Sequence, residues 1–112
     1  MKRVAIAIAL LAILLPLAAS AAGRAGLRIT DRSPLAVRGT GFRPLERVTV
    51  TAFEPQGSLV RRAVATRAGA FTVRFAASAE WCNGVREIRA VGRAGSRAMV
   101  WALPARAECA AP

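Results

Sequence analysis

Residues 70–75 read AFTVRF, in which three apolar side chains are separated by the polar side chains of Thr72 and Arg74. Residues 47–53, RVTVTAF, show the same alternation, with threonines between valine and alanine. Successive side chains of an extended chain point to opposite sides, so this period of two predicts a strand with one buried and one solvated face. We therefore expect both segments to be strands whose threonines face solvent. The side chains expected to face the core are Val48, Val50, Ala52, Phe71, Val73 and Phe75.

Turn-forming residues separate these two segments from five further short segments of the same character. The seven predicted strands span residues 27–30, 35–39, 47–53, 59–66, 70–75, 85–91 and 97–103. Strands at intervals of roughly 8–12 residues, with no amphipathic helical period between them, are typical of a β-sandwich. In the last segment Met99, Trp101 and Leu103 alternate with their neighbours, and we expect these three side chains to face the core.

Residues 39–48, GTGFRPLERV, connect the second and third predicted strands. This segment resembles the G-x-G-F-x-P-x-E-x-V stretch of bacterial extracellular immunoglobulin-like modules, including the IPT/TIG-like group. The resemblance covers residues 27–103 and implies an all-β fold, an immunoglobulin-like β-sandwich of about seven strands. We expect Phe42 to plug one end of this sandwich, and Pro44 and Glu46 to shape the turn. Modules of this kind share no catalytic residues.

Residues 1–22 have the features of a secretory signal, because a basic pair precedes an apolar run that ends in small residues. The run is shorter than the about 20 apolar residues of a spanning helix, and Pro16 interrupts it. We expect cleavage after Ala21 or Ala22, with an uncleaved membrane anchor as the alternative. The remaining residues, 23–112, are predicted to form a single domain that is exported to the periplasm or the extracellular space, with no stable membrane span.

The mature chain contains two cysteines, Cys82 and Cys109. A domain of 90 residues buries a modest core, and an oxidising compartment makes a disulfide the expected use of an isolated cysteine pair. Closing the intervening loop of about 27 residues would stabilise the fold by about 3–4 kcal/mol in the chain-entropy model. A catalytic or metal-binding use is disfavoured because the chain has no histidine.

The mature chain is strongly basic, with a net charge of about +9. Removal of residues 1–22 lowers the 17 basic residues to 15, all of them arginines, against 6 carboxylates. Guanidinium groups bind phosphate, sulfate and carboxylate in bidentate fashion, so an anionic partner is chemically natural. The candidate anion-binding residues are Arg61, Arg62, Arg67, Arg86, Arg89, Arg93 and Arg97. If the last two strands form a hairpin, Arg89 and Arg97 come close together. A solvated face without a ligand is the alternative interpretation.

The sequence predicts no catalytic residue, cofactor or metal site. It contains no histidine and no tyrosine, and Asp31 is its single aspartate, so a Ser-His-Asp or Cys-His arrangement is impossible. The five glutamates are scattered along the chain. No helix is expected after residues 39–41, GTG, so they do not form a phosphate-binding loop.

Two functions remain open at this stage. The first is a non-catalytic, secreted or envelope-associated immunoglobulin-like module with a structural or interaction role, whose partner is a protein. The second is an arginine-mediated binding protein for anionic cell-surface polymers, such as acidic glycans or phosphate-bearing wall and lipid groups. An inhibitor of a secreted hydrolase is a further possibility, whereas export argues against a nucleic-acid partner. The sequence leaves the oligomeric state open.

Overall fold

The computed structural model describes residues 24–80 and 84–102, which form seven β-strands and no helix. The strands are β1 (Gly26–Arg32), β2 (Leu35–Thr40), β3 (Arg47–Glu54), β4 (Gly57–Val64), β5 (Phe71–Arg74), β6 (Glu87–Gly92) and β7 (Arg97–Trp101). All seven predicted strands are therefore confirmed, with bounds that shift by a few residues. The all-β class is confirmed as well.

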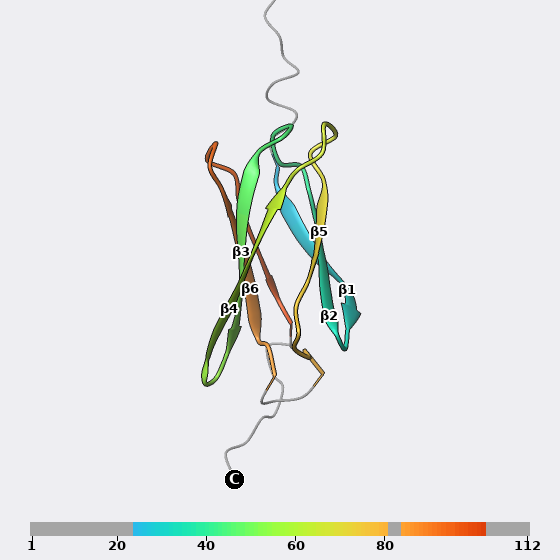
Figure 1. Ribbon diagram of the computed structural model, residues 1–112, viewed down its shortest axis with the longest axis vertical. Helices are drawn as coiled ribbons and strands as arrows, with labels where there is room; N and C mark the ends of the chain where they lie inside the picture. The colour runs from blue at the N-terminus through green and yellow to red at the C-terminus, as the bar shows by residue number, and fades with distance from the viewer. Residues whose placement is uncertain (1–23, 81–83, 103–112) are drawn as a thin grey trace, which may run out of the picture.

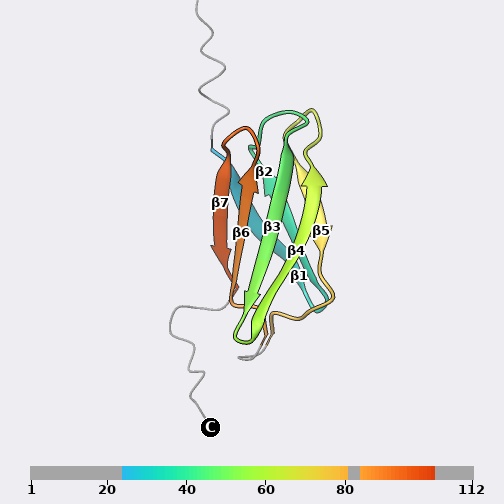
Figure 2. The same ribbon diagram turned by 60° about the vertical axis from the view of Figure 1, so that its left-hand side comes forward.

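The strands form two antiparallel sheets that pack face to face as a sandwich. One sheet has three strands in the order β1-β2-β5, and the other has four in the order β4-β3-β6-β7. Figure 1 shows the two layers edge-on, and Figure 2 shows the four-stranded sheet in front of the three-stranded one. Each sheet thus has one inner face toward the core and one outer face toward solvent.

The core lies between the inner faces, where the predicted alternation holds. On β3 the side chains of Val48, Val50 and Ala52 are fully buried, whereas the outward-facing threonines between them are more exposed. Phe71 and Val73 of β5 are buried in the same way. Fifteen buried apolar residues form one continuous cluster, so both sheets depend on the same core.

The prediction for β7 was wrong. Met99 and Trp101 are 43% and 60% exposed, and the partly buried side chains that pack on the core are Ala98 and Val100. The register with β6 explains the difference, because Val100 pairs with Ile88, whose side chain is fully buried. Paired residues of neighbouring strands share a face, so the two larger side chains point outward. The third residue of the prediction, Leu103, lies outside the described residues.

The connection between β2 and β3 closes one end of the sandwich. Phe42 is buried there and contacts Phe71 edge-to-face, with the ring centroids 5.0 Å apart, as expected of a plug. Gly69 in the β4–β5 turn has φ +81°, and a Cβ atom at that position would lie 2.3 Å from the carbonyl oxygen of Phe42. Only glycine fits this conformation and this close approach.

Several predictions fall outside the described residues. They concern residues 1–22, Cys82 and Cys109, so the signal segment and the disulfide stay predictions. The part of the chain that the structure describes contains no helix long and apolar enough to cross a membrane.

Candidate functional site

The outer face of the four-stranded sheet, here called the four-strand face, combines arginines with exposed apolar side chains. The strand registers place five arginines on it, namely Arg47, Arg62, Arg89, Arg93 and Arg97. It also carries six of the seven large apolar residues that are exposed in the described part of the chain, Phe53, Val60, Val64, Val91, Met99 and Trp101. The one carboxylate placed on this face by the registers is Glu87. The face is therefore both cationic and apolar.

The four-strand face divides along the strands into two halves. The cationic half lies toward the β6–β7 turn and contains Arg47, Arg62, Arg93 and Arg97, with Val64 and Val91 between them. The apolar half lies toward the β3–β4 turn and contains Phe53, Val60, Met99 and Trp101. The two halves present different chemistry on one continuous surface.

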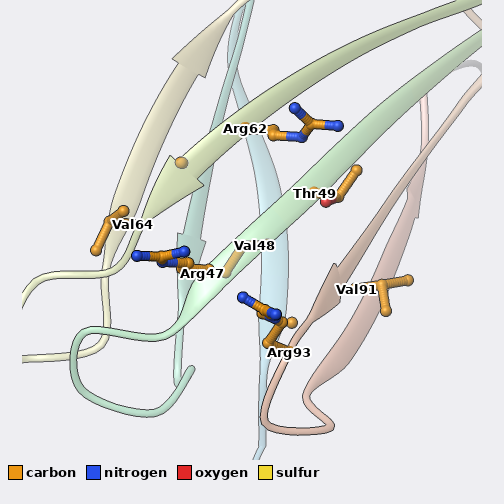
Figure 3. Close-up of a pocket in the computed structure, with 9 residues that line it drawn as sticks. Arg47, Val48, Thr49, Arg62, Val64, Val91 and Arg93 are labelled. Atoms are coloured by element: carbon orange, nitrogen blue, oxygen red, sulfur yellow. The ribbon is translucent and has the colours of Figure 1, made fainter.

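A hollow of about 640 Å³ lies in the cationic half, over β4, β3 and the end of β6. Arg47, Arg62 and Arg93 line it, together with Val64 and Val91, and Figure 3 shows these side chains around the hollow. The backbone N–H of Arg93 donates to the carbonyl oxygen of Arg47 over 2.8 Å, which fixes the two residues side by side. Three arginines from three chain segments thus line one open hollow.

The three arginines of the hollow have no ion-pair partner among the described carboxylates. Neutralisation within the four-strand face occurs instead at Arg89, which pairs with Glu87. The Arg89 guanidinium also lies over the ring of Phe53, 5.7 Å from its centroid. Arg89 is therefore engaged by its own neighbours, whereas no described carboxylate neutralises the arginines of the hollow.

The other five predicted arginines do not line the hollow. The hairpin of β6 and β7 forms, and Arg97 pairs with Val91 while Arg89 pairs with Met99, so the two arginines are diagonal neighbours on one face. Three others stand away from the hollow. Arg61 pairs with Val50 and so lies on the opposite side of β4, Arg67 is in the β4–β5 turn, and Arg86 precedes β6 at the far end of the sheet. The structure thus places Arg62 and Arg93 around the hollow and Arg89 near Arg97, but it does not bring the whole predicted set together.

Arg47 was missed as a site residue. It precedes Val48 at the start of β3, and the alternation of this strand already pointed its side chain away from the core. Its proximity to Arg62 and Arg93 depends on pairing between strands, for which residues 47–53 contain no signal. The exposed apolar residues of β7 were missed because Met and Trp were expected to face the core.

The outer face of the three-stranded sheet has a different composition. Arg28 of β1 pairs with Arg38 of β2, and Arg74 of β5 pairs with Ala36. Arg38 donates a hydrogen bond to the hydroxyl of Thr72 over 3.4 Å. None of the large apolar side chains exposed in the described residues lies on these three strands. This face is basic without being apolar, which makes it an internal control for the four-strand face.

Glu46 holds the loops behind the hollow in place. Its buried carboxylate accepts hydrogen bonds from the backbone N–H groups of Arg43 (2.9 Å), Ala94 (2.8 Å) and Ser96 (3.3 Å), and from the Ser96 hydroxyl (2.7 Å). Burial by itself would raise the pKa of Glu46, but the hydrogen bond from the Ser96 hydroxyl and those from the backbone outweigh it and lower the pKa. Glu46 therefore joins the β2–β3 connection to the β6–β7 turn and thereby fixes Arg47 next to Arg93.

Within the described residues, no group of three or more His, Cys, Asp or Glu side chains is placed to hold a metal ion. Comparison with models of known protein families, with curated proteins and with solved structures finds no match to this chain. The candidate site therefore depends on its own geometry, in which the hollow between Arg47, Arg62 and Arg93 is the strongest feature.

Proposed function

We propose that this chain is a non-catalytic, exported immunoglobulin-like module that binds anionic groups of cell-surface polymers through the four-strand face. Of the two functions left open by the sequence, the geometry favours the arginine-mediated binding protein over a purely structural module. The observation that carries the proposal is the hollow, which Arg47, Arg62 and Arg93 line without an ion pair to a described carboxylate.

The order of the strands supports the immunoglobulin-like part of the proposal. In such sandwiches the first, second and fifth strands share one sheet, and the third, sixth and seventh share the other. The present chain has this distribution, and its fourth strand pairs with the third. In the constant-type domains of antibodies the fourth strand instead joins the first sheet.

The chemistry of the hollow suits phosphate, sulfate or carboxylate groups. Guanidinium is always charged at physiological pH and presents its N–H donors in a planar fork that matches these anions. An extended face also suits a polymer better than an enclosed pocket does, because successive anionic groups can contact Arg97 while one occupies the hollow. Export follows from the predicted signal in residues 1–22 and places the module where such polymers occur.

The proposal leaves out catalysis because the carboxylates of the described chain are committed or isolated. Glu46 is buried and saturated with hydrogen-bond donors, and Glu87 is paired with Arg89. A general acid or base needs a titratable group within reach of a bound substrate. The hollow itself is lined by arginine, threonine and apolar residues, together with Gly92.

Retention on phosphocellulose, compared with unmodified cellulose, tests the proposal. We expect the protein to bind the phosphate-bearing matrix and to elute as salt rises, because exposed charges are screened over about 10 Å at 0.1 M salt. The triple variant R47A/R62A/R93A should bind at least about tenfold more weakly, since each arginine supplies charge-assisted hydrogen bonds.

The matched control is the triple variant R28A/R38A/R74A, which removes the same charge from the three-stranded sheet. It should elute close to the unmodified protein if the hollow is the binding site. Equal losses in both triple variants would show that net charge alone governs retention, and the proposal would then fail.

A further inference from the structure

We infer that the four-strand face takes an anionic amphiphile, in which a phosphate group occupies the hollow and an attached alkyl chain lies along the apolar half. This inference rests on the anion-binding part of the proposed function and names a phosphate-bearing amphiphile as the ligand of that site. It depends on a second observation, namely that the apolar residues of this face form a continuous path that begins at the hollow.

The path runs from Val91 through Met99 to Trp101. Val91 lines the hollow, and it is the diagonal neighbour of Met99 because Arg89 pairs with Met99 and Arg97 pairs with Val91. Diagonal side chains on one face of a sheet lie about 7–8 Å apart, within reach of long side chains. Trp101 follows two residues after Met99 on the same face. Val91, Met99 and Trp101 are 47%, 43% and 60% exposed, respectively.

The length of the path fits an extended alkyl chain. Trp101 pairs with Glu87, four residues before Val91 on β6. At about 3.3 Å per residue the path from the hollow to Trp101 is about 13 Å long. A polyanion without apolar groups would leave these side chains in water, whereas an alkyl chain would cover them.

The charge distribution sets the direction of the ligand. In the apolar half, Arg89 is neutralised by Glu87 and lies over Phe53, so this half carries no unpaired arginine. The arginines that line the hollow have no ion-pair partner among the described residues. The phosphate is therefore drawn to the hollow, and the alkyl chain extends toward Trp101.

A second copy of this chain is a poor occupant of the four-strand face. Two such faces in contact would bring five arginines against five arginines, with one described glutamate on each side. Like charges placed opposite one another across an interface disfavour association. Charge complementarity thus requires an anionic partner.

Calorimetric titration of the purified protein with decyl phosphate, below its micelle concentration, tests the inference. Inorganic phosphate serves as the probe without a chain, and decyl maltoside as the probe without a charge. Burial of only two methylene groups is worth about tenfold in affinity, so decyl phosphate should bind at least tenfold more tightly than inorganic phosphate. Decyl maltoside should bind much more weakly than decyl phosphate.

Two variants separate the contributions of the charge and of the chain. R47A/R93A should weaken the binding of both phosphate probes, by about tenfold or more. M99S/W101S should weaken decyl phosphate alone and remove most of its advantage over inorganic phosphate. The control R28A/R38A, on the three-stranded sheet, should change neither affinity.

Vesicles distinguish a membrane lipid from a free amphiphile as the source of the phosphate. Binding to phosphatidylcholine vesicles that contain phosphatidylglycerol is compared with binding to vesicles of pure phosphatidylcholine. Each vesicle type is tested with the wild-type protein and with R47A/R93A. All variants share the N-terminal segment, so a difference between them reports on the four-strand face. Binding to the anionic vesicles that is lost in R47A/R93A assigns a lipid headgroup, and binding to decyl phosphate alone assigns a free amphiphile.

The failures of the two proposals are distinguishable. Equal affinity for decyl phosphate and inorganic phosphate, with both lost in R47A/R93A, would overturn the inference and leave the proposed function intact. Affinities that do not respond to R47A/R93A would overturn both.

Discussion

At the scale of single residues, Glu46 is a buried carboxylate that is satisfied by dipoles rather than by a cation. Four donors surround it, three of them backbone N–H groups, although the chain is rich in arginine. Charge-assisted hydrogen bonds of this kind are about twice as strong as neutral ones. The negative charge of Glu46 is therefore used to hold two loops together, while the positive charge of the arginines around the hollow is left exposed.

Replacing Glu46 by Gln should destabilise the protein by about 3 kcal/mol at neutral pH. The amide carries no charge, and its NH2 group would face backbone N–H donors from which it cannot accept a hydrogen bond. In a domain of this size the loss corresponds to a melting temperature lower by about 10 °C or more. Thermal unfolding followed by circular dichroism measures the effect. A melting temperature within a degree or two of the wild-type value would contradict the structural role assigned to this carboxylate.

The pH dependence of this contribution has a definite sign. The folded pKa of Glu46 is lowered below its usual value of 4.5, so its contribution is complete above that value and is lost as pH falls through the lower, folded pKa. The difference in unfolding free energy between wild type and E46Q should be constant near neutral pH and shrink in acid. Denaturant unfolding over an acid pH series measures it. A difference that grew on acidification would mean that the folded pKa is raised.

Gly92 provides an independent test of the same contact. A Cβ atom at this position would lie 2.1 Å from the Glu46 Oε2, an oxygen that is held by its hydrogen bonds. Gly92→Ala should therefore lower the unfolding free energy by about 1–3 kcal/mol. Gly57→Ala is the matched control, because nothing lies within 4 Å of its Cβ position. Both changes disturb the same carboxylate. The double variant G92A/E46Q should therefore lose less unfolding free energy than the sum of the losses in the two single variants.

At the scale of the elements, β7 shows that alternation identifies a strand without identifying its buried face. Its residues Arg97–Trp101 alternate in exposure, with the smaller side chains of Ala98 and Val100 inward. Pairing with β6 sets this orientation, because a register shift of one residue would exchange the two faces. The outward position of Met99 and Trp101 leaves two large apolar side chains exposed on the outer face of the sheet.

Substitutions on β7 should accordingly separate stability from binding. M99S/W101S should change the unfolding free energy by about 1 kcal/mol or less, as expected for two exposed positions. Val100→Ala, on the opposite side of the same strand, should cost about 1–2 kcal/mol because Val100 packs on the core. Urea unfolding of the three proteins checks the assignment. A larger loss of unfolding free energy in M99S/W101S than in Val100→Ala would mean that the buried and exposed faces of β7 are assigned the wrong way round.

At the scale of the whole molecule, the two outer faces differ although both are basic. The three-stranded sheet exposes arginine and threonine, whereas the four-strand face adds a continuous apolar path. Net charge alone would make both faces attractive to polyanions. The position of the apolar residues distinguishes the two faces. The variants R47A/R62A/R93A and R28A/R38A/R74A test this difference, because each removes three arginines from one face.

The predicted disulfide between Cys82 and Cys109 also acts at this scale. Its reduction should destabilise the domain by about 3–4 kcal/mol, as the chain-entropy model gives for a loop of about 27 residues. The melting temperature should then fall by several degrees or more. Thermal unfolding with and without a reductant measures the change in melting temperature. A thiol count under denaturing conditions shows whether the two cysteines are bonded in the untreated protein. Two reactive thiols in the untreated protein would rule the bond out.

The sequence by itself determined the seven strands and the residues of β3 and β5 that enter the core. Alternation in residues 47–53 and 70–75 is a local property, because each side chain's direction follows from that of its neighbour in the chain. The expected plug residue, Phe42, is likewise buried at the end of the sandwich against Phe71. Most charged candidates were named as single residues, and the one spatial pair that the sequence predicted, Arg89 with Arg97, follows from the hairpin of β6 and β7.

The tertiary structure alone decided which arginines line the hollow. Arg47, Arg62 and Arg93 come from three segments, and their convergence depends on the registers of β3 with β4 and β6 and on the loops joined by Glu46. It also decided that Met99 and Trp101 face solvent. Pairing between strands is a property of two segments at once, set by competition for a shared core, so no single segment of sequence specifies it.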